Sequence, residues 1–314
     1  MQQKLKNSGF KNWTPNRLPS LQGKTFFITG GNSGIGLEAA KMLAAAGGDL
    51  IIACRNNEKG KAAVEEISTV ASSKIDLVQL DLTDLASVRS AARDVRNYTD
   101  KVDGHINNAG IMQTPQQKTK DGFELQLGTN HLGHFLLTGL MFDLVKNAGG
   151  RVVTVSSIAH KYGRIHLSDL MLTNGYTPTR AYTQSKLANL MFALELDRRL
   201  TAANSQVTSF ACHPGYSDTA LQSTGPRGPL KALYSLTNKL VAQPSYNGAI
   251  PTVLCAAGNE AQPGGYYGPQ SMGDARGPIS DANVTASARN ENIAAKLWDE
   301  SEKLVGFDWA SVLG

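Results

Sequence analysis

The chain has 314 residues, of which 41% are hydrophobic and 18% are charged, and its formal net charge is +5. This length and apolar content suffice for one large α/β domain with a full core. The basic excess is spread along the chain without a cluster of five or more Lys or Arg residues, which argues against nucleic-acid binding. No segment approaches the roughly 20 apolar residues that a membrane-spanning helix needs.

The three cysteines are widely spaced and form no C-x-x-C pair, which is typical of free thiols in a reducing compartment. Residues 1–24 are polar and lack the apolar core of a secretory signal. We therefore expect a cytoplasmic protein. Residues 1–22, interrupted by prolines, are expected to form an irregular N-terminal arm, and residues 23–314 a single domain.

A glycine-rich stretch, Thr-Gly-Gly-Asn-Ser-Gly-Ile-Gly at residues 29–36, follows an apolar β-type run and opens onto a helix-like segment. Glycine permits positive φ and lets backbone N–H groups approach a phosphate, and a helix N-terminus favours negative charge. We expect a diphosphate site here, although an ordinary turn is the alternative for such a motif alone. The expected contacts are Gly30, Asn32, Ser33, Gly34, Ile35 and Gly36.

Strand-like and helix-like segments alternate along the rest of the chain. Strands are expected at residues 25–28, 50–54, 75–80, 103–107, 151–156 and 206–211 and near 264–268. Helices are expected at residues 37–46, 58–67, 85–98, 123–146 and 182–200, the third of them capped by Thr83 or Asp84. This alternation predicts a Rossmann-type α/β fold, with a doubly wound parallel sheet of about seven strands in a single domain.

Tyr182 and Lys186 are four residues apart near the start of a predicted helix, so their side chains share one helix face. Tyrosine titrates near pH 10, and a neighbouring ammonium lowers the tyrosine pKa toward the range of a useful acid or base. A Ser156-Ser157 pair ends a strand, and the carboxyl ends of parallel strands line the ligand crevice. Each motif alone occurs by chance, but together with the glycine-rich stretch they point to one crevice.

These motifs, in this order, resemble the short-chain dehydrogenase/reductase family. Residues 29–36 match its T-G-x-x-x-G-I-G motif, residues 107–110 its N-N-A-G motif, and Tyr182 with Lys186 its Y-x-x-x-K motif. The resemblance runs from about residue 24 to the C-terminus. Residues 128–135, 151–157, 265–269 and 297–298 look like the branch that contains retinol dehydrogenases and light-dependent protochlorophyllide reductases.

The resemblance implies roles for individual residues. Tyr182 would be the proton donor or acceptor, and Lys186 would lower its pKa and bind the nicotinamide ribose. Ser157 would orient the reacting oxygen, and Asn130 would hold a water that links Lys186 to solvent. The remaining cofactor contacts implied by the family are Asp81 and Leu82 at the adenine, the Asn108, Ala109 and Gly110 turn, and Pro214, Gly215 and Thr219 at the nicotinamide carboxamide.

The residues at the end of the second predicted strand bear on the choice between NADP(H) and NAD(H). NAD-type sites usually place an acidic residue there, but this chain has Arg55 and Asn56 and no carboxylate before Glu58. A guanidinium can bind a 2′-phosphate that a carboxylate would repel. The sequence therefore predicts NADP(H) in preference to NAD(H), with a surface arginine that begins a turn as the alternative.

Three further segments bear on function. His131 and His134 share a helix, but no third ligand has suitable spacing, so packing roles are expected and no metal site is predicted. Residues 158–181 form an insertion that leaves the oligomeric state open, a homodimer included. Residues 219–241 are expected to form a lid whose apolar stripe favours a hydrophobic substrate, although packing on the body is the default for such a stripe.

The sequence thus predicts an NADPH-dependent oxidoreductase that interconverts a small-molecule carbonyl compound and an alcohol by hydride transfer. Two alternatives stay open. One is a cofactor-binding regulator that senses redox state, and the other is a C=C reductase of the protochlorophyllide reductase type. The sequence does not identify the substrate.

Overall fold

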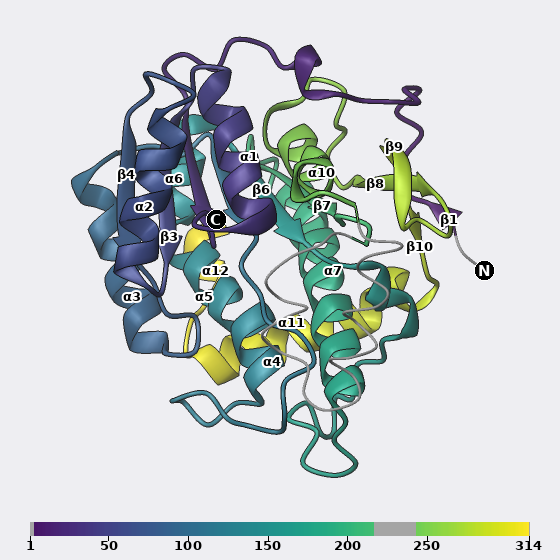
Figure 1. The fold of residues 1–314 in the computed structure, drawn as a ribbon. Helices are drawn as coiled ribbons and strands as arrows, with labels where there is room; N and C mark the ends of the chain where they lie inside the picture. Colours follow the sequence, from purple (N-terminus) through teal and green to yellow (C-terminus); the bar gives the residue numbers. More distant parts are fainter. Residues whose placement is uncertain (1–2, 217–242, 314) are drawn as a thin grey trace.

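The computed structural model describes residues 3–216 and 243–313, and its centre is an eight-stranded sheet in the order β4-β3-β2-β5-β6-β7-β8-β9 (Figure 1). Its strands are β2 (Thr25–Thr29), β3 (Asp49–Cys54), β4 (Ile75–Gln79), β5 (Gly104–Asn107), β6 (Arg151–Val155), β7 (Thr208–Cys212), β8 (Tyr266–Ser271) and β9 (Arg276–Asp281). Neighbouring strands pair in parallel from β4 to β8. The prediction of a Rossmann-type parallel sheet is confirmed, with an antiparallel strand β9 added at one edge.

Helices cover both faces of this sheet, because apolar side chains of the central strands point alternately to the two faces. In β2, Phe27 packs into one core cluster, whereas Phe26 and Ile28 pack into the other. The first face carries α3 (Leu85–Asp94), α5 (Gly133–Leu140), α6 (Phe142–Ala148) and α7 (Pro178–Ala202), and the second carries α1 (Gly34–Ala45), α2 (Asn57–Ser68) and α10 (Ser245–Ala257). Asp84 caps α3 by accepting N–H groups of its first turn, as expected.

The segment expected to be helical over residues 123–146 is helical from Leu125 to Ala148, with Met141 as the one residue outside a helix, but it is not one regular α-helix. The segment is divided into a single turn α4 (Leu125–Leu127), a π-helical turn (Gly128–Leu132), α5 and α6. The π-helical turn contains Asn130, whose amide side chain bonds the backbone of Ile111 instead of facing solvent. A π-helical turn inside a helix frequently marks a functional position.

The N-terminal arm contains a short strand and a 3₁₀ turn (Pro15–Arg17), and it is packed onto the body of the protein. Trp13 is fully buried, and its indole N–H donates to Glu260 Oε2 at 2.7 Å. Near its start, β1 (Gln3–Lys4) pairs with β10 (Asn283–Val284). Buried aromatic surface and a charge-assisted hydrogen bond therefore hold the arm in place.

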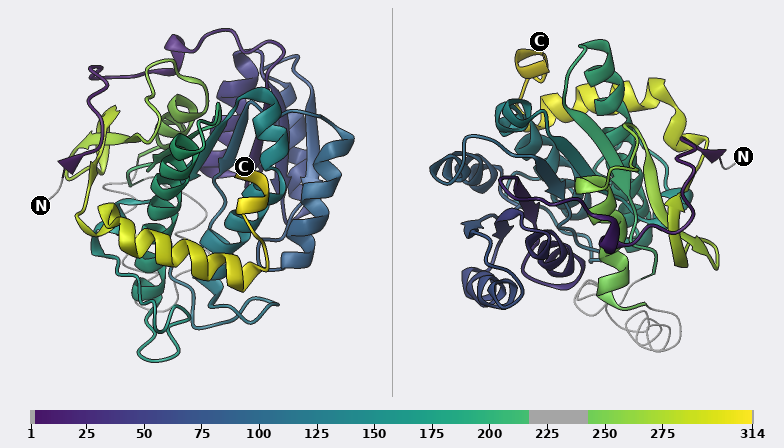
Figure 2. Two further views of the ribbon diagram at one scale, coloured as in Figure 1. Left: turned by 180° about the vertical axis from the view of Figure 1, so that it is seen from behind. Right: turned by 90° about the horizontal axis from the view of Figure 1, so that it is seen from above.

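The C-terminal helix α11 (Glu291–Val305) lies across α7 and α5 on the outer side of the first helix layer, as the view from behind shows (Figure 2). Trp298 of α11 stacks on Phe192 of α7, with ring centroids 5.6 Å apart. Trp309 is fully buried against the same aromatic group. In the described part of the chain, no helix is both long enough and apolar enough to cross a bilayer.

Strand order reverses between β2 and β5, since β3 lies on one side of β2 and β5 on the other. In an open α/β sheet a ligand crevice forms at this point, outside the carboxyl ends of the strands. The glycine-rich stretch follows β2, and the Asn-Asn-Ala-Gly turn follows β5. The topology therefore brings together two motifs that are about 75 residues apart in the sequence.

Candidate active site

The glycine-rich loop between β2 and α1 has a geometry that only glycine allows. Gly30 has φ +68°, in the left-handed region. A Cβ on Gly36 would lie 2.3 Å from the carbonyl oxygen of Gly30, so any side chain there would push the helix away from the loop. The loop is thus packed directly against the first turn of α1, and it forms a backbone cradle of the kind that a phosphate can approach closely.

The N-terminus of α1 presents backbone donors to this cradle. Ser33 is the N-cap residue, and no side-chain hydrogen bond caps the helix. The first N–H groups of a helix have no partner within it, and they attract an anion. Asn32 is half-buried, Ser33 is exposed, and Ile35 is buried beneath the first turn. These residues fit the diphosphate of a dinucleotide.

Thr29 connects the glycine-rich loop to the Asn-Asn-Ala-Gly turn. Its hydroxyl accepts the N–H groups of Asn108 at 3.0 Å and Ala109 at 2.9 Å. The Asn108 side chain in turn donates to the carbonyl oxygen of Thr29 at 2.8 Å. A Cβ on Gly30 would lie 3.1 Å from Ala109, so the two turns are also in direct contact.

Asn130, Gly110 and Lys186 meet at the carboxyl end of β5. A Cβ on Gly110 would lie 3.1 Å from Asn130 Oδ1 and 3.5 Å from Lys186 Nζ, so these three residues are closely packed. Asn130 Oδ1 accepts the N–H of Ile111 at 2.8 Å, and its Nδ2 donates to Ser185 Oγ at 2.9 Å. The amide is held on both sides, and its orientation follows from these contacts.

Lys186 lies in the third turn of α7, a helix that begins at Pro178 because Thr177 caps it and Pro178 is tolerated at its first position. The Lys186 side chain is buried, and Nζ donates to the carbonyl oxygen of Val155 at 3.2 Å. Burial disfavours the ammonium form and lowers the pKa of Lys186 to about 8. Tyr182 is half-buried one turn earlier on the same helix.

Ser157 stands at the carboxyl end of β6, where a short 3₁₀ turn (Ile158–Tyr162) begins. Its Oγ accepts the N–H of Ala159 at 3.2 Å, which fixes the side chain at the N-cap of that turn. The preceding Ser156 donates its hydroxyl to the carbonyl oxygen of Lys186 at 2.7 Å. β6 and α7 are therefore joined directly beside the Ser157, Tyr182 and Lys186 positions.

The loop after β7 forms another wall of the crevice. Gly215 has φ +71°, and a Cβ there would lie 2.3 Å from the carbonyl oxygen of Ala275. The carbonyl oxygen of Pro214 accepts from Gln243 Nε2 at 2.6 Å. Thr219 and the predicted lid at residues 219–241 lie outside the described residues.

Two of the residues expected at the adenosine end of the cofactor are exposed to solvent. Arg55 and Asn56 are exposed after β3, and Asn56 Oδ1 accepts the N–H of Lys59 as the N-cap of α2. The structure therefore gives the Asn56 oxygen a structural role that the sequence analysis did not anticipate. Asp81 accepts from both the N–H and the hydroxyl of Thr83, and Leu82 is buried.

His131 and His134 both make hydrogen bonds inside the core. His131 Nε2 lies 2.8 Å from Ser301 Oγ, and His134 Nε2 lies 2.8 Å from Thr29 Oγ1. Burial lowers the pKa of each imidazole to about 3, so both rings are neutral. Among residues 3–216 and 243–313, no group of three or more His, Cys, Asp or Glu side chains could hold a metal ion. The link from His134 to Thr29 was missed, although its spacing of four from Asn130 places both on one helix face.

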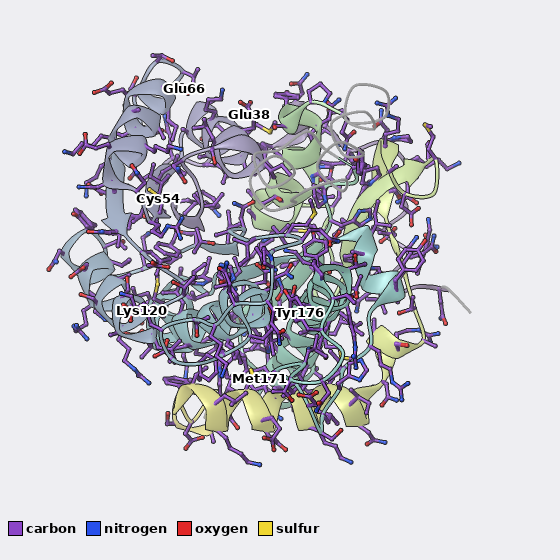
Figure 3. All side chains as sticks on the ribbon, turned by 60° about the horizontal axis from the view of Figure 1, so that its bottom comes forward. Glu38, Cys54, Glu66, Lys120, Met171 and Tyr176 are labelled. Carbon is purple, nitrogen blue, oxygen red and sulfur yellow. The ribbon has the colours of Figure 1, made fainter. Side chains whose placement is uncertain are left out.

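The insertion at residues 158–181 packs over the segment before α4. Figure 3 labels Met171 and Tyr176, two residues of this insertion. The Tyr176 hydroxyl donates to the carbonyl oxygen of Thr114 at 2.8 Å, and Met171 Sδ accepts the N–H of Glu124 at 3.2 Å. These contacts cover the region beside the crevice.

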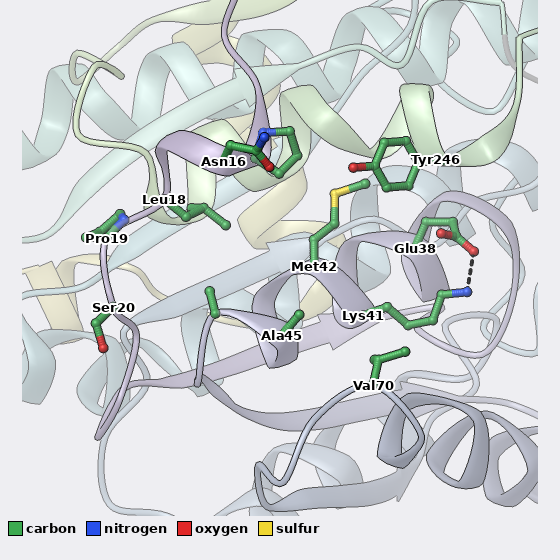
Figure 4. Close-up of a pocket in the computed structure, with 12 residues that line it drawn as sticks. Asn16, Leu18, Pro19, Ser20, Glu38, Lys41, Met42, Ala45, Val70 and Tyr246 are labelled. Atoms are coloured by element: carbon green, nitrogen blue, oxygen red, sulfur yellow. Dashed lines mark ion pairs between the residues drawn. The ribbon is translucent and has the colours of Figure 1, made fainter.

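A pocket of about 570 Å³ lies away from the motif residues, between the N-terminal arm and α1 (Figure 4). The Glu38–Lys41 ion pair of α1 lies at this pocket, with the two side chains 2.7 Å apart. Its apolar lining includes Leu18, Met42 and Tyr246. None of the candidate site residues lines it, so it is separate from the crevice.

Comparisons with known proteins agree with this geometry. The sequence profile of the family described as short chain dehydrogenase matches residues 24–227. Human retinol dehydrogenase 13 is 40% identical over 306 residues, covering 93% of this chain and 88% of that protein. Human retinol dehydrogenase 11 is also 40% identical, over 91% of this chain and 87% of its own length. A crystal structure of a protein from Mycobacterium paratuberculosis superposes with a TM-score of 0.80 at 40% identity, covering 95% of this chain and 99% of that one.

Proposed function

The chain belongs to the short-chain dehydrogenase/reductase family, and from this premise we propose that it is an NADPH-dependent oxidoreductase that interconverts a hydrophobic carbonyl compound and its alcohol. The catalytic domain in this proposal spans residues 23–314, with residues 1–22 as an arm. One observation carries the proposal. Gly110, Asn130 and Lys186 approach one another at the carboxyl ends of the strands, and Lys186 lies on the same helix as Tyr182.

In this proposal NADPH, when bound, supplies the hydride. Tyr182 donates a proton to the carbonyl oxygen in reduction and accepts it in the reverse direction. Lys186, protonated at neutral pH, stabilises the phenolate that remains. Ser157 orients the reacting oxygen through its hydroxyl. The Ser156 hydroxyl donates to the carbonyl oxygen of Lys186, and the Lys186 ammonium donates to that of Val155, so these two bonds join β6 to α7.

Asn130 would act as a relay residue in this scheme. Its side chain is fully engaged with Ile111 and Ser185, so its backbone and not its amide would face a bridging water. The π-helical turn around it alters the regular i→i−4 bonding of the helix there. A proton lost from Tyr182 could then be replaced through Lys186 from solvent.

The cofactor preference rests on Arg55. It is exposed at the carboxyl end of β3, and no acidic side chain in the described part of the chain forms an ion pair with it. An unpaired guanidinium at this place can bind a 2′-phosphate bidentately. The hydrophobic substrate class is suggested by relatives named retinol dehydrogenases and by the apolar stripe in the sequence of residues 219–241.

A panel of aldehydes, ketones, alcohols and enones, assayed with NADP(H) and NAD(H), tests the proposal. We expect carbonyl–alcohol turnover with NADP(H), and a loss of about 10²–10⁴-fold in kcat for Tyr182→Phe. Tyr98→Phe, at an exposed tyrosine away from the crevice, is the matched control and should keep full turnover. Wild-type turnover by Tyr182→Phe on every active substrate would exclude this mechanism, and turnover of enones alone would favour C=C reduction.

A further inference from the structure

A buried ion pair joins two walls of the crevice that are far apart in the sequence. Lys161 Nζ lies 2.6 Å from Asp274 Oδ2, and the two side chains are only 12% and 10% exposed. Most ion pairs in the described part of the chain have at least one partner more than a third exposed. Exposed pairs contribute little, whereas a buried pair constrains the groups that it joins because separation would leave an uncompensated charge.

On one side, Lys161 belongs to the 3₁₀ turn that starts at Ser157. That turn is short and internally bonded, since His160 Nδ1 lies 2.7 Å from the carbonyl oxygen of Ser157 and its N–H donates to the same oxygen. Displacement of Lys161 would therefore be transmitted to Ser157. Ser157 is the residue proposed to orient the reacting oxygen.

On the other side, Asp274 belongs to the tight turn between β8 and β9. Met272, Gly273 and Asp274 all have positive φ, at +52°, +67° and +70°. Two non-glycine residues in this region cost conformational energy, which persists only where the surroundings hold the backbone in place. The ion pair is one such restraint.

The β8–β9 turn is in direct contact with the loop after β7. The N–H of Tyr216 donates to the carbonyl oxygen of Ala275 at 2.8 Å. The absence of a side chain on Gly215 lets the same oxygen approach its backbone closely. Displacement of Asp274 would therefore be transmitted to Gly215 and Tyr216.

We propose that Lys161 and Asp274 are positioning residues: their ion pair sets the separation between the Ser157 wall and the Gly215 wall of the crevice. The role of these walls in aligning a carbonyl with the nicotinamide ring rests on the proposed function. The glycine-rich loop lies elsewhere in the fold and holds the diphosphate without this pair. Loss of the pair should therefore impair alignment more than it impairs cofactor binding.

Asp274→Asn removes only the charge of the aspartate, because asparagine keeps the shape of the side chain and tolerates the left-handed backbone. Lys161→Met/Asp274→Asn removes both charges, so no buried charge remains uncompensated and thermal stability should return toward that of the wild type. Lys303→Met is the matched control, since Lys303 also forms a 2.6 Å ion pair but lies on the surface of α11.

Hydrogen exchange of the cofactor-free chain provides the first readout. We expect about tenfold faster amide exchange at Gly215 and Tyr216 in Asp274→Asn and in the double variant, and no change there in Lys303→Met. With NADPH and a carbonyl substrate found in the panel, kcat should fall about tenfold in both variants while the NADPH Kd stays within threefold of the wild type.

Unchanged exchange at Gly215 and Tyr216 would overturn the positioning role, whatever the enzyme assays show. Recovery of wild-type kcat by the double variant together with its stability would also overturn it, because the pair would then serve stability alone. If exchange rises as expected but the wild type binds neither NADPH nor NADH, the coupling of the two walls stands and the proposed function fails instead.

Discussion

Thr29 Oγ1 lies 2.8 Å from His134 Nε2 in the core beneath the glycine-rich loop. The hydroxyl already accepts two N–H groups, so its own proton is directed to the imidazole. His134 Nδ1 then carries the ring proton and donates to the carbonyl oxygen of Asn130 at 3.0 Å. One neutral histidine thus joins the glycine-rich loop to the π-helical turn that carries Asn130.

Replacing His134 with Phe should disturb both ends of this connection. The Thr29 hydroxyl loses its closer acceptor and keeps only the carbonyl oxygen of Ile106 at 3.4 Å, so we expect destabilisation of about 1–3 kcal/mol in urea unfolding and weaker NADPH binding. His131→Phe is a matched control, because it loses a bond to Ser301 on α11 and leaves the loop intact. Equal NADPH affinities in the two variants would contradict a role for His134 in shaping the loop.

Gly36→Ala should abolish dinucleotide binding. The added Cβ would meet the carbonyl oxygen of Gly30 at 2.3 Å, so the first turn of α1 must move away from the phosphate cradle. Fluorescence titration with NADPH measures the loss, which we expect to exceed 100-fold, the order that a 1 Å misplacement can cost. Gly122→Ala, at a positive-φ glycine with open space around it, should cost only about 1 kcal/mol of stability and leave binding unchanged.

Lys186→Met should separate stability from activity. The buried ammonium has lost its hydration and bonds the carbonyl oxygen of Val155, so an apolar side chain of similar length is expected to keep or raise the free energy of unfolding. Turnover should fall by about 10²–10⁴-fold, because the Tyr182 phenolate loses its neighbouring charge. Unfolding in urea and steady-state assays on one preparation measure the two effects. A variant that is both destabilised and inactive would point to a structural role.

Arg55→Asp should exchange the cofactor preference. A carboxylate repels the 2′-phosphate of NADPH and accepts a hydrogen bond from the 2′-hydroxyl of NADH. We expect the KM for NADPH to rise by about tenfold or more, which corresponds to a loss of about 1.4 kcal/mol or more of binding free energy, while the KM for NADH changes far less. Lys59→Asp, a nearby surface position on α2, controls for the change of net charge. Equal changes for both cofactors would reject Arg55 as the discriminating residue.

Acid should destabilise the fold well above the range where carboxylates titrate. Burial lowers the pKa of the core histidines to about 4 for His105 and His160 and to about 3 for His131, His134 and His213. Below pH ~6.5 the unfolded chain binds protons that the folded chain cannot, so stability is full above this pH and falls as the pH drops toward 4. Each histidine contributes a slope of about 1.4 kcal/mol per pH unit.

Urea unfolding at pH 8, 7, 6 and 5 measures this slope. His131→Asn removes one of these groups and should reduce the slope between pH 6 and 5 by about 1.4 kcal/mol per pH unit. A free energy of unfolding that is constant from pH 8 to 5 would show that these imidazoles are accessible to protons in the folded state.

The parallel sheet and the positions of the motifs could be predicted from residue patterns, because both depend on local physics. Apolar runs of strand length between helical segments specify a doubly wound sheet, and that topology places the ends of β2, β5 and β6 at one edge. Glycine is needed at positions 30 and 36 because of a close backbone contact between residues only six apart in the sequence. The Tyr182–Lys186 spacing likewise needs only helix geometry.

Other features depend on partners that are distant in the sequence. The helix predicted over residues 123–146 is interrupted where Asn130 bonds Ile111 and Ser185, and helical periodicity carries no information about those bonds. The burial of Trp13 depends on Glu260, and β9 depends on pairing with β8. The protonation states of His134 and Lys186 follow from desolvation, and the Lys161–Asp274 pair spans 113 residues. Local pattern thus locates the chemistry, whereas long-range packing sets the charge state and orientation of the groups that perform it, because desolvation and contact exist only once the chain has folded.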